Sequence, residues 1–254
     1  MKTHILSGAG SGIGRATAVM LAQDPQNHLV LIGRNMEHLL SLKKELANPQ
    51  QHEIINCSVT DQATLSSSFK NLQLGDKNLV SVIANAGISG ANIYGPHDRW
   101  DEIMATNVKG VYILGNEAYP YLKQAKTEYR NIVIISSVLA HMGVPYLPAY
   151  CASKAAVLGL MRSWAVQWAA DKILVNAICP GWVQTPMAEN GIAEMAKASG
   201  QSYEKMLSAQ MDVLPLKKMS RPEELAALVR FLISGEQTSI TGEEVQINNG
   251  SVMH

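Results

Sequence analysis

Short apolar runs of strand-like character alternate with longer segments of helical periodicity along most of the chain. Such alternation is typical of βαβ units, in which successive strands lie parallel and the crossovers are right-handed. The sequence therefore predicts an α/β fold in one Rossmann-type domain over residues 1–254, a doubly wound parallel sheet of about seven strands with helices on both faces. Strands are expected near residues 3–8, 28–33, 52–57, 79–85, 131–136, 173–179 and 244–248, and helices near 12–23, 36–47, 61–72, 99–126, 149–170 and 221–234.

A glycine-rich turn separates the first expected strand from the first expected helix, with glycines spaced Gly-x-x-x-Gly-x-Gly. Glycines let the backbone approach a pyrophosphate, and the following helix N-terminus supplies free N–H groups and a positive dipole end. The spacing is neither G-x-G-x-x-G nor a P-loop, and a glycine turn can be loop chemistry alone. Its place directly after a strand favours a dinucleotide site. The expected contacts are Gly8, Gly10, Ser11, Gly12, Ile13 and Gly14.

Tyr150 and Lys154 lie four residues apart at the start of an expected helix, so they share one helix face. A nearby lysine cation favours the phenolate, which predicts a pKa for Tyr150 lowered from about 10 toward working pH. A tyrosine tuned in this way can give or take a proton during catalysis. An ordinary amphipathic helix is the alternative, and the spacing alone does not decide between the two.

Two further polar residues stand at informative places. Ser137 follows the β-branched run 132–135, which is typical of a strand buried on both faces of a parallel sheet. It is therefore expected at the same carboxyl edge of the sheet as the glycine turn. Asn107 lies inside a helical pattern, where Asn is mildly unfavourable, so a functional, packing or capping role is expected for it.

These motifs occur in one order along one chain, and together they resemble the short-chain dehydrogenase/reductase family. The resemblance covers essentially all of the sequence, including the final strand segment 240–250, and is nearest to 3-oxoacyl-carrier-protein reductases and polyketide ketoreductases. The motifs that carry it are Gly8-x-x-x-Gly12-x-Gly14, Asn85-Ala86-Gly87, Asn107, Ser137, Tyr150-x-x-x-Lys154 and Pro180-Gly181-x-x-x-Thr185.

The resemblance implies an oxidoreductase that interconverts a carbonyl and a secondary alcohol by hydride transfer. Tyr150 would be the general acid/base, Ser137 would bind the substrate oxygen, and Lys154 would tune Tyr150 and bind the nicotinamide ribose. Asn107 would hold a water that relays protons to Lys154. The further cofactor contacts that it implies are Asn85, Ala86, Gly87, Pro180, Gly181, Val183 and Thr185.

Three positions depart from the pattern of the family. Ser7 stands where Thr is usual and keeps a hydroxyl, and Ala84 replaces the first Asn of the usual Asn-Asn-Ala-Gly. Ser58 replaces an Asp that contacts the adenine amino group in relatives. Because a serine hydroxyl still accepts a hydrogen bond, Ser58 and its neighbour Val59 are expected to remain adenine contacts.

The end of the second expected strand bears on the choice of dinucleotide. An acid that holds the adenosine ribose is expected about 20 residues past the glycine turn. Gly33 stands there and cannot accept those hydrogen bonds, while Arg34 follows with a guanidinium suited to a 2′-phosphate. Gly33 and Arg34 together predict NADP(H), with NAD(H) as the alternative. The other interpretation of Arg34 is a solvated charge in a loop.

Composition excludes several classes of function. Lys plus Arg and Asp plus Glu number 21 each, so the net charge is zero and nothing favours nucleic acid or an anionic membrane as partner. No signal peptide or membrane-spanning run is recognised. The three scattered cysteines are expected to be reduced thiols in a cytoplasmic protein. The seven histidines show no metal-ligand spacing, so no metal site is expected.

Residues 186–219 interrupt the alternation and carry five methionines. Methionine often fills cores flexibly, but the resemblance implies a mobile substrate lid here, whose apolar content points to a partly apolar substrate. The five are Met187, Met195, Met206, Met211 and Met219.

The two longest expected helices carry apolar residues on more than one face. This predicts a homo-oligomer, a dimer or tetramer, paired through these helices, unless neighbouring helices of the same subunit cover them. The residues concerned are Val111, Tyr112, Ile113, Leu114, Leu158, Leu160, Met161, Trp164, Val166 and Trp168.

A small-molecule carbonyl or alcohol is the expected partner of the chain. The alternative function is a non-catalytic dinucleotide-binding regulator or paralogue on the same fold. The complete set of Ser137, Tyr150 and Lys154 argues against that alternative.

Overall fold

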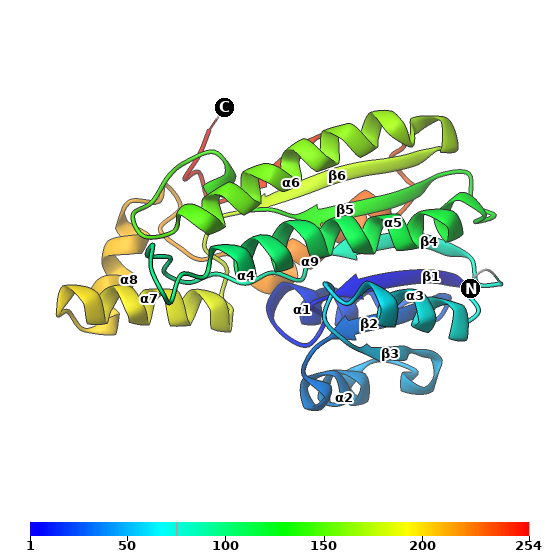
Figure 1. Cartoon of the computed structure of the whole chain (residues 1–254), viewed down its shortest axis with the longest axis horizontal. Coiled ribbons are helices and arrows are strands. Elements are labelled where there is room, and N and C mark those ends of the chain that lie inside the picture. Colours follow the sequence, from blue (N-terminus) through cyan, green and yellow to red (C-terminus); the bar gives the residue numbers. More distant parts are fainter. Residues whose placement is uncertain (75, 254) are drawn as a thin grey trace.

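Seven parallel strands form a single sheet in the order β3-β2-β1-β4-β5-β6-β7 in the computed structural model, which describes residues 1–74 and 76–253 (Figure 1). Each strand begins and ends within one residue of the predicted position. The strands are β1 (Lys2–Ser7), β2 (Asn27–Gly33), β3 (Glu53–Asn56), β4 (Leu79–Ala84), β5 (Arg130–Ile135), β6 (Ile173–Pro180) and β7 (Glu244–Ile247).

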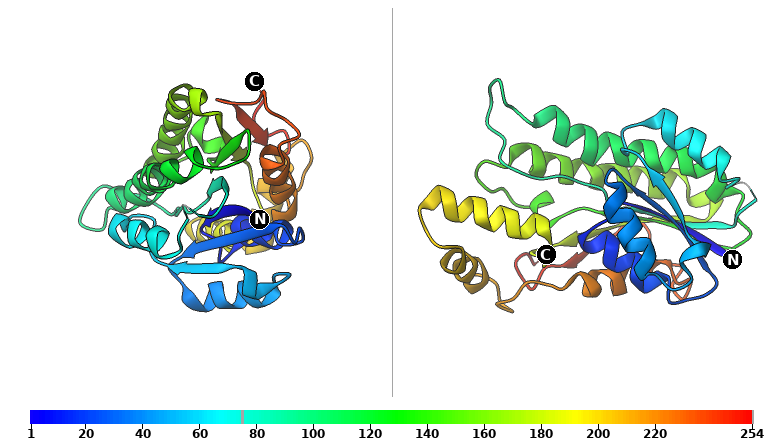
Figure 2. Two further views of the ribbon diagram at one scale, coloured as in Figure 1. Left: turned by 90° about the vertical axis from the view of Figure 1, so that its right-hand side faces the viewer. Right: turned by 90° about the horizontal axis from the view of Figure 1, so that it is seen from below.

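Helices cover both faces of the sheet, as Figure 2 shows from two sides. Alternate residues of a buried strand serve the two cores, so Ile5 of β1 joins one and Leu6 the other. The doubly wound fold is therefore confirmed. One face carries α3 (Gln62–Asn71), α5 (Gly110–Lys123) and α6 (Pro148–Gln167), and the other carries α1 (Gly12–Leu21), α2 (Met36–Glu45) and α9 (Pro222–Ile233).

The long helix expected near residues 99–126 is interrupted. It consists of α4 (Trp100–Met104), a π-helical turn (Ala105–Lys109) and α5. A single π turn inserts one extra residue into a helix and re-aims the side chains around it. The following long helix, α6, ends near its expected position. Within the described part of the chain, no helix is long and apolar enough to cross a membrane.

Residues 186–219 form two helices beyond the carboxyl ends of the strands, α7 (Pro186–Ser199) and α8 (Tyr203–Asp212) (Figure 1). They share a small apolar cluster that includes Met206, while Met187 and Met195 are exposed. Met206 of this segment therefore fills a small core, whereas Met187 and Met195 face solvent.

A buried polar network joins β1, β2 and β4 near the amino ends of the strands. His4 Nδ1 lies 2.7 Å from the Ser81 hydroxyl, and His4 Nε2 lies 3.0 Å from Asn27 Oδ1. Burial lowers the pKa of His4 to about 4, and burial lowers that of His28 to about 4 as well. Both rings are therefore neutral in the folded protein at neutral pH.

We expect acid to destabilise the fold through these rings. In the unfolded chain His4 binds a proton below about pH 6.5, whereas in the folded protein it stays neutral down to about pH 4. The free energy of unfolding therefore falls as the pH drops through this window. The contribution of His4 is on the order of 2–3 kcal/mol at about pH 4.5. Urea denaturation at about pH 7.5 and about pH 4.5 measures it.

The variant His4→Gln provides the comparison, because its amide can hydrogen-bond without titrating. It should show a smaller loss of stability on acidification than the wild type, with His28 supplying part of what remains. An unchanged loss would contradict the role assigned to His4.

Candidate active site

The predicted site residues gather at the carboxyl edge of the sheet, where the strand order reverses between β1 and β4. Open α/β sheets bind ligands at such a reversal. A cleft of about 690 Å³ lies there, lined by the ends of β1 to β4 and the segments that follow them. Its lining includes Gly8, Gly10, Ser11, Gly33, Arg34, Asn35, Glu37, His38, Ser58, Val59, Ala86, Gly87, Ile88 and Thr106.

The glycine turn needs glycine for two separate reasons. Gly8 has φ of 63°, a left-handed conformation that residues with a Cβ rarely adopt. A Cβ on Gly14 would lie 2.3 Å from the carbonyl oxygen of Gly8, well inside van der Waals contact. The turn can therefore close onto the first turn of α1 only without side chains at these positions.

Hydrogen bonds tie the turn after β1 to the turn after β4. The Asn85 amide donates to the carbonyl oxygens of Ser7 and Gly8, each at 3.1 Å. The Ser7 hydroxyl accepts from the backbone N–H groups of Asn85 and Ala86, at 3.0 and 3.1 Å. Serine at position 7 thus supplies the acceptor that a threonine hydroxyl would, and Ala84 lies buried at the end of β4.

The Asn107 side chain lies in the π-helical turn and is fully buried. Its Oδ1 accepts from the backbone N–H of Ile88 at 2.8 Å, and its Nδ2 donates to the Ile88 carbonyl at 2.9 Å. Nδ2 also lies 2.9 Å from the Ser153 hydroxyl, which donates to the Tyr150 carbonyl. This asparagine therefore braces the segment after β4 against the first turn of α6, which accounts for a poor helix former at this position.

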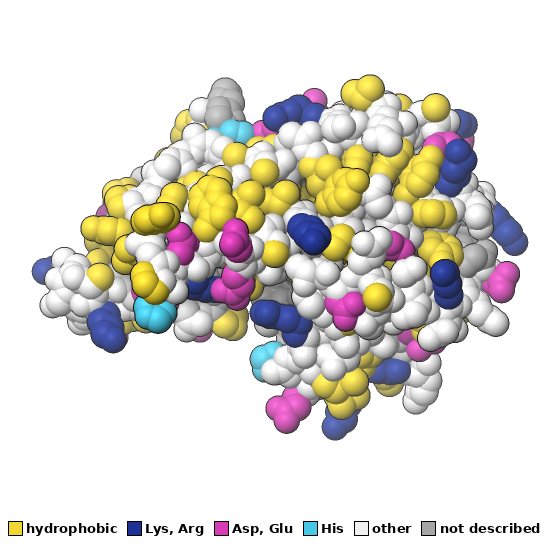
Figure 3. All heavy atoms as spheres, in the orientation of Figure 1, with side chains coloured by type: hydrophobic (Ala, Val, Ile, Leu, Met, Phe, Trp, Pro, Cys, Tyr) yellow, Lys and Arg dark blue, Asp and Glu magenta, His cyan; other side chains and the backbone are white. Residues whose placement is uncertain are grey.

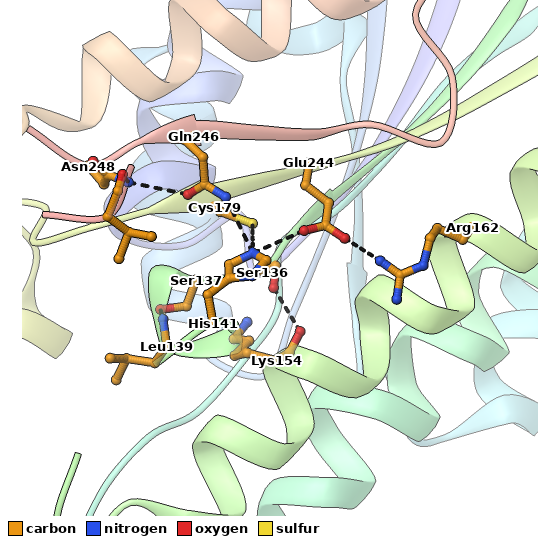
Figure 4. Close-up of polar contacts among 11 residues, drawn as sticks. Ser136, Ser137, Leu139, His141, Lys154, Arg162, Cys179, Glu244, Gln246 and Asn248 are labelled. Carbon is orange, nitrogen blue, oxygen red and sulfur yellow. Dashed lines mark hydrogen bonds and ion pairs between the residues drawn. The ribbon is translucent and has the colours of Figure 1, made fainter. Parts of the chain in front are cut away.

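Ser137, Tyr150 and Lys154 come together beside this brace. Ser137 begins a short turn, and its hydroxyl accepts from the Leu139 backbone N–H at 3.1 Å. Lys154 Nζ donates to the Ile135 carbonyl at 2.8 Å and lies 5.6 Å from the centre of the Tyr150 ring. The Ser136 hydroxyl donates to the Lys154 carbonyl at 2.8 Å (Figure 4).

The predicted lowering of the Tyr150 pKa is wrong. Burial raises the pKa of Tyr150 to about 12, and a hydrogen bond with the Ser137 side chain opposes this rise only in part. Burial also lowers the pKa of Lys154 to about 8. Removing charged groups from water penalises both ionised forms, and the Lys154 ammonium points to a backbone carbonyl. Sequence spacing carries no information about this desolvation.

Arg34 is exposed and borders the cleft, as do the glycine turn and Ser58. Asn35 caps α2, because its Oδ1 accepts from the His38 backbone N–H at 3.0 Å. Ser58 Oγ lies 2.8 Å from the Thr60 hydroxyl and faces the same cleft. Sequence reasoning missed Glu37 and His38 in the lining; only the packing of the first turn of α2 beside Gly10 reveals them.

The remaining predicted contacts lie after β6, outside the lining of this cleft. Gly181 donates its backbone N–H to the Ile247 carbonyl at 3.1 Å, directly after Pro180 ends β6. Val183 forms a bridge with Ser220. Thr185 caps α7 and packs close to Gly12, where an added Cβ would lie 2.9 Å from Thr185 Cγ2. Of these residues, Thr185 is therefore the one that adjoins the glycine turn.

The chain is similar in sequence and in fold to known proteins. A family model described as enoyl-(acyl carrier protein) reductase matches residues 8–252. The 3-oxoacyl-(acyl-carrier-protein) reductase FabG of Thermotoga maritima is 32% identical over 256 residues, which cover 99% of this chain and 98% of that protein.

Two solved structures show the same fold. Levodione reductase has a TM-score of 0.88 and 26% identity, covering 98% of this chain and 96% of that one. The actinorhodin polyketide ketoreductase with NADPH has a TM-score of 0.91 at 24% identity, covering 98% and 97%. The latter likeness shows the fold alone.

We expect Gly14→Ala to abolish dinucleotide binding, because its methyl group would collide with the Gly8 carbonyl and open the turn. The matched control is Gly159→Ala in α6, where an added Cβ meets no atom within 4 Å. That change should preserve binding and stabilise the helix by up to about 1 kcal/mol. Fluorescence titration with NADPH and NADH measures binding, and an undiminished affinity of Gly14→Ala would contradict the assigned turn.

Proposed function

The chain belongs to the short-chain dehydrogenase/reductase family of oxidoreductases, and we propose that it interconverts a ketone and a secondary alcohol with NADP(H). The observation that carries the proposal is the meeting of Ser137, Tyr150 and Lys154 beside Gly87. A Cβ on Gly87 would lie 3.3 Å from both Lys154 Nζ and Asn107 Oδ1. The backbone at this glycine therefore approaches the polar cluster at the edge that carries the cleft, an arrangement that a non-catalytic regulator would not need.

In this mechanism the dinucleotide supplies or accepts the hydride, and the side chains handle the proton. The Tyr150 phenol donates its proton to the carbonyl oxygen of the substrate during reduction. The Ser137 hydroxyl hydrogen-bonds the same oxygen and fixes the carbonyl for attack. Lys154 would hold the nicotinamide ribose of a bound dinucleotide, while Asn107 keeps the surrounding segments in register through Ile88 and Ser153.

Tyr150 carries its proton at neutral pH, as a proton donor for carbonyl reduction must. With a pKa of about 12, the phenol is protonated throughout the neutral range. A general acid must carry its proton before the step, whereas alcohol oxidation needs the phenolate as base. The half-buried Tyr150 phenol therefore meets the first requirement of a general acid, which is to hold a proton.

Arg34 supports the choice of NADP(H). It follows Gly33, which has no side chain to accept from ribose hydroxyls, and its exposed guanidinium borders the cleft. Arginine pairs with phosphate through a planar fork of donors. Glu37 borders the same cleft, and its negative charge opposes the binding of an anion there.

We also propose that residues 186–219 form a lid over a partly apolar substrate. The two ends of the lid are tied together, because Gln184 donates to the Ser220 carbonyl and Ser220 donates to the Trp182 carbonyl, each at 2.9 Å. α7 and α8 therefore project from a single junction. The exposed Met187 and Met195 give the lid an apolar surface, in keeping with the acyl substrate named for the Thermotoga relative.

A homo-oligomer, a dimer or tetramer, is proposed through α5 and α6, whose face carries a band of apolar side chains in Figure 3. Most of the apolar residues named from the sequence are buried within the chain, partly in a stacked aromatic series that includes Trp164 and Trp168. Tyr112 and Val166 remain 53% and 81% exposed and support the interface. The free thiols among the described residues support the cytoplasm as its location.

Light scattering at micromolar protein tests the oligomer. We expect a dimeric or tetrameric mass for the wild type and a lower mass for Val166→Arg, because the new charge would be buried at the interface. A monomeric wild type would refute the interface.

Tyr150→Phe should lower kcat for ketone reduction by at least about a hundredfold while preserving cofactor affinity, because only the proton donor is lost. Tyr129→Phe removes a hydroxyl before β5, at the opposite edge of the sheet, and should leave kcat unchanged. NADPH oxidation with a panel of ketones measures both variants. Activity of Tyr150→Phe within a few-fold of wild type would exclude the assigned acid.

Arg34→Ala should weaken NADPH binding by about tenfold or more and leave NADH binding nearly unchanged, since a charge-assisted hydrogen bond contributes about 1.5–3 kcal/mol. The control Arg230→Ala removes an exposed arginine of α9 that does not border the cleft and should affect neither cofactor. Equal losses for both cofactors in Arg34→Ala would show that this side chain does not read the 2′-phosphate.

A further inference from the structure

Three side chains with metal-binding atoms meet beside the loop that follows Ser137 (Figure 4). His141 lies just after the short turn Val138–Ala140, Cys179 lies on β6, and Glu244 begins β7. One ligand atom of each lies within 4.8 Å of the corresponding atoms of the other two. Figure 4 shows the imidazole, the thiol and the carboxylate pointing toward one another from three separate segments.

The distances are close to those that a tetrahedral metal ion requires. Zinc binds nitrogen and oxygen at about 2.0 Å and sulfur at about 2.3 Å, so its ligand atoms lie about 3.3–3.6 Å apart. His141 Nε2 lies 3.0 Å from Glu244 Oε2 and 4.0 Å from Cys179 Sγ. Adjustments of less than about 1.5 Å would bring all three atoms to one centre.

The surroundings suit a bound cation. Cys179 is buried, and the side chains of His141 and Glu244 are 19% and 20% exposed, so the centre is shielded yet reachable. The Gln246 amide nitrogen lies 3.3 Å from His141 Nε2, and a half-turn of this amide would offer its oxygen as a fourth donor. Arg162 pairs with the other carboxylate oxygen of Glu244 and leaves Oε2 facing the imidazole.

We propose that His141, Cys179 and Glu244 form a site for a divalent transition-metal ion, with zinc as the ion that their mixed nitrogen, sulfur and oxygen donors fit best. The ion would clamp the loop after Ser137 to β6 and β7. On binding, the Cys179 thiol gives up its proton to solvent and coordinates as the thiolate, while the imidazole binds through the unprotonated Nε2. No change of oxidation state is involved.

The proposed metal site does not include Tyr150, the proposed proton donor, but it contacts Ser136 and Ser137. The thiol of Cys179 makes hydrogen bonds with the Ser136 side chain and the Ser137 backbone, and burial raises its pKa to about 11. Lys154 and Glu244 are the charged groups that act on this thiol, in opposite directions. A metal ion held by Cys179 would therefore restrain Ser136 and Ser137 through these hydrogen bonds.

Cobalt(II) provides a direct probe, because thiolate coordination to cobalt gives a charge-transfer absorption band that oxygen and nitrogen ligands do not. Titration of the purified protein with CoCl₂ should produce this band with saturation at one equivalent. The band should disappear in Cys179→Ser and persist in Cys57→Ser, which removes a different buried cysteine. A missing band in the wild type, or a band that survives in Cys179→Ser, would overturn the proposal.

Zinc affinity, measured by competition with a chromophoric chelator, supplies a second readout that does not depend on the serine variant folding. Glu244→Gln should weaken binding by at least about tenfold, whereas Arg162→Gln should strengthen it, because it frees the carboxylate from a competing cation. Affinity should rise by up to about tenfold per pH unit between about pH 6 and pH 8, since the thiol must lose a proton. If the zinc affinity were unaltered in Glu244→Gln, or did not depend on pH, the proposal would be overturned. These residues would then form an ion-pair network and no metal site.

Discussion

The hydrogen bonds between the turns after β1 and β4 are the constraint on which the rest of the site depends. Asn85 bridges to Ser7 and Gly8, and Ser7 returns the contact through its hydroxyl. Because the strand order reverses between these two strands, their turns diverge to opposite faces of the sheet and would separate without this tie. The tie holds the glycine turn beside Gly87, and Gly87 in turn lies against Lys154 and Asn107.

The π-helical turn extends this arrangement toward the proton donor. Asn107 uses its amide on Ile88 and Ser153, and Ser153 contacts the carbonyl of Tyr150. A buried amide with satisfied donors and acceptors is costly to displace, so it fixes the segments that it joins. The helix interruption is thus explained by a polar side chain that must reach two neighbouring segments at once.

Desolvation controls the protonation of the site more strongly than charge pairing does. Burial raises the pKa of Tyr150 and lowers that of Lys154, so both groups are driven toward their neutral forms. The same effect keeps His4 neutral at the other end of the sheet. Packing among strands and helices, rather than the proximity of Tyr150 and Lys154, therefore decides the direction of these shifts.

The sequence by itself determined the strands, the order of helices and the place of the glycine turn, because hydrophobic periodicity and glycine chemistry are local properties. It also singled out Ser137, Tyr150 and Lys154 as candidate site residues, because their order and spacing can be seen in the sequence. Only the tertiary structure decided the pKa directions and the π turn at Asn107, because both depend on burial by distant segments. The meeting of His141, Cys179 and Glu244 was likewise decided by strand packing: β6 and β7 pair although 63 residues lie between them, which no ligand spacing in the sequence can express.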